Sequence, residues 1–245
     1  MDFALTEDQI MIRDAAREFA QNEIAPVAAE FDLSGEFPEQ TIKAAAELGF
    51  MGVEIPEEYG GSGLDPVCYA LMMTEISAAD AAHGTIVSVN NSLFGVPLLE
   101  FGTEEQKQKY LVPVASGQLN GAYALTEPQS GSDAAAMRAK AVLSADGSHY
   151  MINGKKSWIT SGPVARYVVF FAQTVGEDGE DRGISAFIID AEADGYHRGK
   201  LEPKLGIRAS DTGAFVLNNC RIPKDNILGS SEVKKEKTTA GFKGV

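Results

Sequence analysis

Apolar residues recur at helical spacing through the first 119 residues of the chain. Thr6 and Gln9 form a capping-box pair, and the apolar positions that follow line one face of a predicted helix. Because a proline inside a helix removes a backbone donor, we expect this helix to end near Pro26. A second helix is predicted over residues 37–50, with Pro38 in its first turn and Gly49 at its end.

The segment 66–102 is apolar on most faces. A helix tolerates that pattern only when other helices enclose it, so we expect this segment at the centre of a helical bundle. The preceding stretch, 52–65, is rich in glycine and is predicted to be a loop. A second capping-box pair, Thr103 and Gln106, predicts a short helix to about Val112.

The pattern changes near residue 119. Short stretches rich in β-branched and aromatic residues then alternate with Gly, Asp and Asn turns, which predicts strands. Asp146-Gly147 and Asn153-Gly154 are predicted hairpin turns, because such turns need positive φ. We therefore predict an α+β chain with three parts: an N-terminal all-helical bundle domain over 1–119, an antiparallel β-barrel-like middle domain over 120–229, and a disordered polar tail over 230–245.

Composition narrows the classes of function. Of 245 residues, 44% are hydrophobic and 23% are charged, as in folded globular proteins. A formal net charge of -14 would repel phosphate backbones, so we expect no nucleic-acid partner. The sequence has no long apolar run and no signal-peptide pattern at its start, so we expect no membrane partner and a cytoplasmic or organelle-matrix location.

Cysteines and histidines show no metal-site spacing. Cys68 and Cys220 lie far apart in apolar or strand-like contexts, and we interpret both as packing residues. His83, His149 and His197 fall in helix, hairpin and loop contexts, where structural roles are favoured. The chain also lacks the Walker, HExxH and GxSxG motifs.

Two stretches carry the candidate chemistry. "YALTEPQSGSD", residues 123–133, follows a predicted strand and offers the hydroxyls of Thr126, Ser130 and Ser132 to a planar heterocycle or a phosphate. "KKSWITSG", residues 155–162, places Trp158 two residues before Thr160, and period 2 puts both on one face of a strand. A flat ring beside a hydroxyl suits a flat cofactor with a polar edge. The structural alternative is a tryptophan that anchors the core and a loop that is only a capped turn.

These stretches are followed in order by "LGIRASDT" and "IPKDNILG", and together they resemble the acyl-CoA dehydrogenase family over about residues 1–229. "GTIVSVNNSLFGVPLLEFGTEEQKQKYL" is most similar to the short-chain, butyryl-type members. The resemblance implies FAD-dependent α,β-dehydrogenation of an acyl-CoA thioester to a trans-2-enoyl-CoA. Electrons would pass to an electron-transferring flavoprotein. The implied location is a bacterial cytoplasm or the mitochondrial matrix, not a secreted protein, and the implied assembly is a homo-oligomer.

The resemblance also implies site residues. Five residues of the first stretch would form the loop that contacts the flavin and acyl-CoA: Tyr123, Leu125, Thr126, Gly131 and Ser132. Within it, Thr126 would bond the pyrimidine edge and Ser132 would also touch the CoA arm. Three residues of the second stretch would pack on one flavin face: Trp158, Ile159 and Thr160. The Thr160 hydroxyl would reach the N5 and O4 edge.

One departure from the family leaves the activity open. Family members continue beyond "NILG" into a second helical bundle that supplies the catalytic glutamate, and we expect that bundle to be absent from this chain. No carboxylate here matches that base, and the family position of Glu127 is structural. Three readings remain: a dehydrogenase completed by another chain, a truncated non-catalytic FAD- or acyl-CoA-binding relative or scaffold, or an acyl-CoA oxidase or flavin monooxygenase of the same fold. An exposed apolar patch and self-association are also expected.

Overall fold

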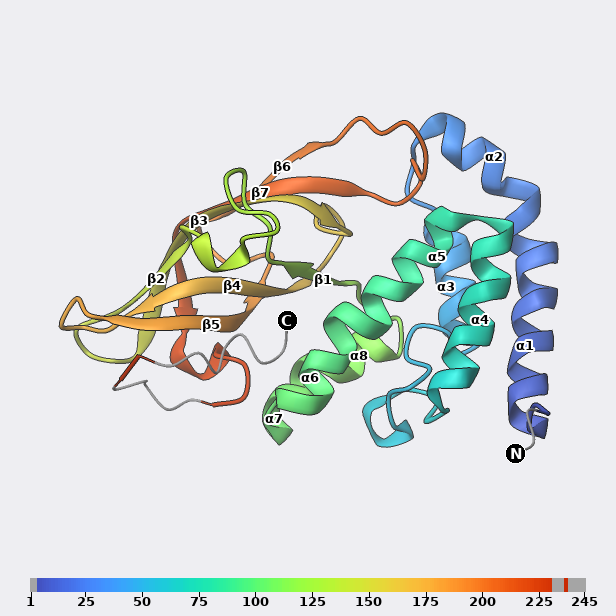
Figure 1. Cartoon of the computed structure of the whole chain (residues 1–245), viewed down its shortest axis with the longest axis horizontal. Coiled ribbons are helices and arrows are strands. Elements are labelled where there is room, and N and C mark those ends of the chain that lie inside the picture. The colour runs from blue at the N-terminus through green and yellow to red at the C-terminus, as the bar shows by residue number, and fades with distance from the viewer. Residues whose placement is uncertain (1–3, 231–235, 238–245) are drawn as a thin grey trace.

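A computed structural model describes residues 4–230 and 236–237, and it shows a helical part packed beside a curled sheet (Figure 1). Helices follow one another from Glu7 to Ala115, and strands from Gly121 to Pro223. The predicted α+β class is therefore confirmed. Apart from Ser230 and residues 236–237, the predicted tail lies outside the described residues.

The helical part consists of α-helices joined in three places by π-helical segments, whose hydrogen bonds span five residues. The α-helices are α1 (Glu7–Phe19), α2 (Ala25–Ser34), α3 (Glu39–Glu47), α4 (Pro66–Ala79), α5 (Ala81–Ser88), α6 (Val96–Phe101), α7 (Glu104–Gln106) and α8 (Val112–Ala115). The π-helical segments are Ala20–Ile24, Val89–Gly95 and Lys107–Leu111. Both predicted capping boxes, at Thr6 and Thr103, are present.

The prediction that the first helix ends near Pro26 was wrong. The chain continues from α1 through Ala20–Ile24 into α2, and Pro26 lies in the first turn of α2. The Ala25 amide, directly before the proline, donates to the carbonyl of Ala20 five residues earlier. This wider turn accommodates a residue that has no N–H and would otherwise clash with the carbonyl four residues back.

The same arrangement occurs at Pro97 and Pro113, each of which follows a π-helical segment by one residue. The amides that precede these two prolines, Val96 and Val112, also donate to carbonyls five residues earlier. The last helical stretch therefore passes the predicted end at Val112 and reaches Ala115.

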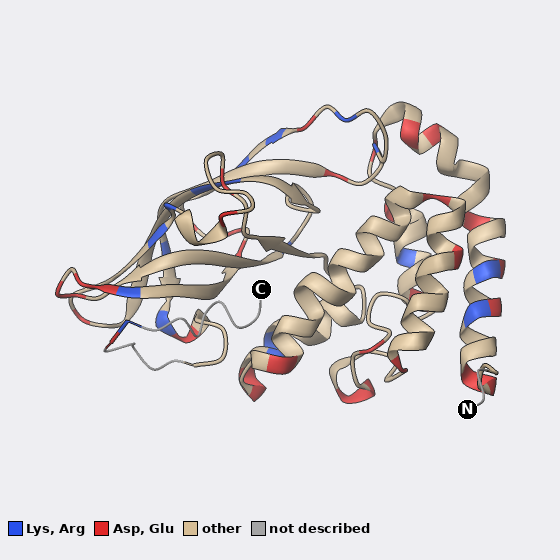
Figure 2. Ribbon diagram, in the orientation of Figure 1, with Lys and Arg blue, Asp and Glu red and all other residues tan. Residues whose placement is uncertain are grey.

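The prediction that the apolar segment 66–102 is enclosed by other helices holds for its later part, because most residues from Ala82 to Leu98 are buried, whereas α4 buries only one face, with Cys68, Met72 and Ile76. From Ala81 to Leu99 the segment carries no Lys, Arg, Asp or Glu, and Figure 2 shows α5 and the π-helical segment Val89–Gly95 that follows it without charged residues. Buried Asn90 donates from Nδ2 to the carbonyls of Met51 (3.2 Å) and Val114 (2.8 Å). Its Oδ1 accepts from the Gly121 amide at 3.0 Å, so this helix positions the first strand.

Seven strands form one curled sheet in the order β1-β4-β2-β3-β7-β6, with β5 on the other side of β4. The strands are β1 (Gly121–Ala124), β2 (Lys140–Leu143), β3 (His149–Thr160), β4 (Tyr167–Val175), β5 (Asp181–Asp190), β6 (Tyr196–Leu201) and β7 (Thr212–Pro223). Two pairings, β1 with β4 and β2 with β4, are parallel, and the others are antiparallel. The sheet is therefore mixed, which the sequence did not predict.

One of the two predicted hairpin turns was wrong. Asp146-Gly147 does join β2 to β3, whereas Asn153-Gly154 lies inside β3. The pairing of β3 with β7 shifts register between Ile152 and Gly154. A Cβ at Gly154 would lie 2.5 Å from the Ala139 Cβ, so the glycine serves a close approach of strands.

Three clusters of buried apolar residues hold the chain together. One lies within the helices and includes Cys68, and one lies within the sheet and includes Cys220, which confirms both cysteines as packing residues. The third combines helical residues such as Phe94 and Leu98 with sheet residues such as Phe171. Among the residues that the structure describes, no helix is long and apolar enough to span a membrane.

Candidate functional site

The two predicted stretches lie against each other in the structure. β1 ends at Ala124, and the chain then forms the loop 125–139 before β2 begins. Lys156 Nζ, on β3, donates to the Leu125 carbonyl at 2.9 Å. The Ser157 amide donates to the Thr126 carbonyl at 3.0 Å. The loop is therefore attached to β3 immediately before Trp158.

A buried ion pair lies beneath this attachment. Lys156 Nζ lies 2.9 Å from Glu127 Oε1, and both side chains are almost fully buried. Glu127 also accepts from the amides of Arg138 (2.6 Å) and Ala139 (3.0 Å) and from Gln129 Nε2 (2.6 Å). Burial opposes ionisation of Glu127, but these hydrogen bonds outweigh it, so the pKa of the carboxyl lies below its ordinary value. Glu127 is therefore an ionised structural group.

A β-bulge sets the direction of the Trp158 side chain. The pairing of β3 with β7 shifts register between Lys156 and Ile159. Trp158 lies in this bulge at φ 57°, in the left-handed region, and the residue is 60% exposed. Ile159 is buried and Thr160 is half-buried, so the sides alternate from 158 to 160 as period 2 predicts. The Ile159 side chain packs in the sheet core, which leaves only its backbone facing the exposed surface.

The polar groups around Trp158 fit a planar ligand with a polar edge. Within the described residues, the hydroxyls of Thr126, Thr160 and Ser132 have no protein hydrogen-bond partner. Gly131 and Ser132 are exposed at the outer part of the loop, and no described contact joins them to Trp158. Burial raises the pKa of Tyr123 to about 12, so this hydroxyl stays protonated. An exposed indole beside free hydroxyls matches the chemistry of a flavin ring.

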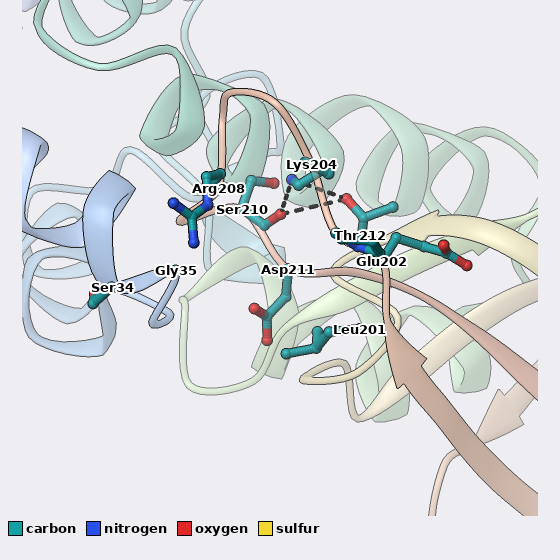
Figure 3. A pocket seen from close by; sticks show the side chains of 10 residues that line it. Ser34, Gly35, Leu201, Glu202, Lys204, Arg208, Ser210, Asp211 and Thr212 are labelled. Carbon is teal, nitrogen blue, oxygen red and sulfur yellow. Dashed lines mark hydrogen bonds between the residues drawn. The ribbon is translucent and has the colours of Figure 1, made fainter.

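A small cavity of about 210 Å³ lies beside this surface, between the end of α2 and the connection from β6 to β7 (Figure 3). Lys204 Nζ donates to oxygens of Ile207, Ser210 and Thr212 and so folds this connection. Thr212 lies opposite Thr160 in the pairing of β3 with β7. The cavity contains both acidic and basic side chains and includes none of the predicted site residues.

Sequence reasoning missed the role of Lys156. A lysine on a strand is normally exposed, and its neighbour Lys155 is. Strand alternation alone would have placed one of the two lysines inside, and Glu127 in the adjoining loop was the available partner. Among the described residues, no cluster of His, Cys, Asp and Glu is arranged to hold a metal.

Family models match both halves of the chain. The acyl-CoA dehydrogenase N-terminal domain matches residues 6–118, and the acyl-CoA dehydrogenase middle domain matches residues 122–220. This chain belongs to the acyl-CoA dehydrogenase family. The family resemblance drawn from the sequence motifs is thereby confirmed.

Individual relatives are short-chain members of the family. The short-chain specific acyl-CoA dehydrogenase of Clostridium acetobutylicum is 46% identical over 229 residues, which are 94% of this chain and 60% of the relative. The mitochondrial short-chain specific acyl-CoA dehydrogenase of Sus scrofa is 44% identical over 225 residues, 92% of this chain and 54% of the relative. The chain thus spans about 60% of the length of such relatives, or less.

Solved structures of acyl-CoA dehydrogenases share the fold. Butyryl-CoA dehydrogenase from Megasphaera elsdenii superimposes with a TM-score of 0.87 at 37% identity, covering 94% of this chain and 60% of that one. Acyl-CoA dehydrogenase from Bacillus anthracis, solved with FAD, superimposes with a TM-score of 0.85 at 38% identity, and the match covers 92% of this chain and 38% of that one. A chain from a structural study of the electron transferring flavoprotein of Acidaminococcus fermentans superimposes with a TM-score of 0.88 at 46% identity, and the match covers 94% of this chain and 60% of that one.

Proposed function

We propose that residues 1–119 and 120–229 are the helical and middle domains of a flavin enzyme that dehydrogenates a short-chain acyl-CoA thioester to a trans-2-enoyl-CoA. The observation that carries this proposal is the exposed, left-handed Trp158 beside the unpartnered hydroxyls of Thr126 and Thr160. The short-chain specific relatives support the substrate class.

The residues of this chain would bind FAD and prepare it for reaction. Trp158 would cover one face of the ring and exclude water from it, while Thr126 and Thr160 would donate hydrogen bonds to the polar edge. FAD supplies the acceptor for the hydride that leaves the acyl β-carbon. Gly131 and Ser132, exposed on the outer loop, would contact the acyl-CoA. Hydrogen bonds in a site that excludes water stabilise developing charge more strongly than those in bulk solvent.

A base must remove the α-proton, and Glu127 is not suited to that role. It is 2% exposed, and Lys156 and two backbone amides hold it in its ionised form. This favours a second candidate, in which the chain alone binds FAD and acyl-CoA without turnover. An oxidase or flavin monooxygenase of the same fold is the third candidate.

The deciding experiment is an anaerobic titration of the FAD-loaded chain with butyryl-CoA, followed by flavin absorbance. Bleaching would show that the chain dehydrogenates by itself. A spectral shift without bleaching would support the binding module, with the base supplied from elsewhere. Oxygen consumption without an electron acceptor protein would support the oxidase. A folded chain that binds no FAD would contradict the proposal.

Electron-transferring flavoprotein is the proposed electron acceptor, and the Acidaminococcus fermentans relative supports it. We also propose a homo-oligomer, because large apolar side chains such as Leu33 and Leu205 are exposed. Light scattering that shows a monomer at high concentration would contradict this assembly. Bacterial and mitochondrial relatives support a location in the cytoplasm of bacteria or in the mitochondrial matrix.

A further inference from the structure

Three consecutive residues of the candidate flavin loop are fixed to β3. The carbonyl of Leu125 accepts from Lys156 Nζ at 2.9 Å, and that of Thr126 accepts from the Ser157 amide at 3.0 Å. The carboxylate of Glu127 accepts from the same Lys156 Nζ at 2.9 Å. Ser157 thus holds Thr126 itself, and Lys156 holds the residues on either side of it. Lys156 and Ser157 directly precede Trp158.

The opposite side of this arrangement reaches β2. Glu127 Oε2 accepts from the Arg138 amide, and Oε1 accepts from the Ala139 amide, at the point where the loop returns to the sheet. The Lys156 ammonium lies 4.9 Å from the centre of the Phe170 ring on β4, in the interior of the sheet. One buried ion pair therefore connects both ends of the loop to the strand that carries the indole.

Stability alone does not explain such a pair. Two charges lose their hydration when they are buried, and well-packed apolar residues of similar volume often give equal or greater stability. A fully buried ammonium that donates two hydrogen bonds instead fixes the distances between the groups it contacts, because each hydrogen bond has a narrow range of length and angle. Binding sites require this support when two segments far apart in sequence must hold one rigid ligand.

We infer that the Lys156–Glu127 pair is a positioning device that sets the Thr126 hydroxyl relative to Trp158, so that flavin affinity depends on it separately from fold stability. The inference rests on the proposed function of this surface as the FAD site. Lys156 touches no ligand in this assignment and acts only through the loop and the bulge.

The test uses the full chain with Lys156→Met, Glu127→Gln and the Lys156→Met/Glu127→Gln double variant. Lys155→Met, which changes the exposed neighbour on the same strand, is the matched control. Lys156→Met alone leaves a buried carboxylate unpaired and is expected to be the least stable variant. The double variant removes both charges and keeps the test decisive if the single variant does not fold.

Two readouts apply to folded protein. The FAD dissociation constant is obtained from quenching of Trp158, which is the single tryptophan of the chain. Urea unfolding followed by circular dichroism gives stability independently. We expect the double variant to recover part of the stability lost in Lys156→Met while its FAD dissociation constant stays about tenfold or more above that of the unmodified chain. Lys155→Met should change neither. Equal affinity in the double variant and the unmodified chain would overturn the inference.

A ligand-free readout separates this inference from the proposed function. Hydrogen exchange of the Ser157 amide, which donates to Thr126, is expected to be about tenfold or more faster in the double variant. If the unmodified chain binds no FAD, the proposed function fails, and exchange still reports whether the ion pair fixes the loop. Unchanged exchange in the double variant would overturn the positioning role whatever the chain binds.

Discussion

At the scale of the residue, Trp158 is large, apolar, exposed and held in the left-handed backbone region. That region is unfavourable for residues with a side chain, and the cost persists only where the surrounding structure fixes it. β3 fixes it through the bulge that follows buried Lys156. The strain is consistent with a residue placed for ligand contact rather than for packing.

Replacing Trp158 with glycine is expected to leave the free energy of unfolding unchanged or to raise it by about 1 kcal/mol, because glycine adopts positive φ without strain. FAD binding should weaken strongly. Urea denaturation followed by circular dichroism measures the first effect, and ultrafiltration with FAD measures the second. Trp158→Ala is the control, since it removes the ring and retains the backbone strain. A loss of about 2 kcal/mol or more on Trp158→Gly would instead support the core-anchor alternative.

The pKa of Glu127 gives a prediction for acid stability. This pKa lies below its ordinary value of 4.5 in the folded chain, so the stabilising contribution is present above 4.5 and is lost as pH falls through the folded-state pKa. If the thermal midpoint of unfolding is measured at decreasing pH from neutral, it should decrease once the pH is below 4.5. In the Lys156→Met/Glu127→Gln variant the decline should be shallower, and an identical decline would assign the acid sensitivity to other carboxylates.

At the scale of the element, β3 carries both register shifts of the β3–β7 pairing, one after Ile152 and one after Lys156. The first places Gly154 against Ala139, and the second turns Trp158 outward. A single strand thus contacts the loop 125–139 at Gly154, Lys156 and Ser157 and presents the exposed indole at the second bulge.

Gly154→Ala is expected to destabilise the chain by about 1–3 kcal/mol, because the added methyl would overlap Ala139 and the strands would have to separate. Gly131→Ala is the matched control, since a Cβ there meets nothing within 4 Å. Urea unfolding of both variants tests this. Equal stabilities would show that the strands separate at no cost. The control should still weaken acyl-CoA binding if ligand approaches Gly131 closely.

Sequence patterns predicted these elements well where one local rule decided the outcome. The capping boxes at Thr6 and Thr103 and the turn at Asp146-Gly147 depend on neighbouring residues only. The prediction at Pro26 was wrong because a π-helical turn, which is local but rare, replaced the expected helix end, and that at Asn153-Gly154 was wrong because the non-local approach of Ala139 overrode local preference. The candidate site was found through its motif, whereas its buried lysine depends on a partner 29 residues away along the chain.

At the scale of the whole molecule, helices and sheet share a core. The third apolar cluster takes residues from both parts, and Gln106 adds polar contacts across the boundary. Gln106 Nε2 donates to the carbonyls of Asp225 (2.8 Å) and Ile227 (2.7 Å), and its Oε1 accepts from the Gly229 amide at 3.1 Å. Neither part can unfold without exposing apolar surface of the other.

The chain is therefore expected to unfold in one cooperative transition. Calorimetric and van't Hoff enthalpies should agree, and circular dichroism and Trp158 fluorescence should give the same midpoint. Gln106→Ala removes the hydrogen-bond partner of two carbonyls, Asp225 and Ile227, and of two amides, Thr103 and Gly229, so it should lower that midpoint and keep the single transition. Two separate transitions in the unmodified chain would show that the shared core contributes little coupling.

The three proline-linked π-helical segments also bear on how this chain tolerates insertions and deletions. Each wide turn accommodates an extra residue within a continuous helix. Because the turn absorbs the additional residue, the residues beyond it keep the facing that they would have in an uninterrupted α-helix. Deleting one residue from Val89–Gly95 would therefore restore an ordinary α-helical turn and leave Leu98 in the shared core, but it would set Pro97 against the carbonyl four residues earlier. Single-residue differences in length between such chains are therefore expected at these segments, where a helix can gain or lose a residue without changing the face that packs in the core.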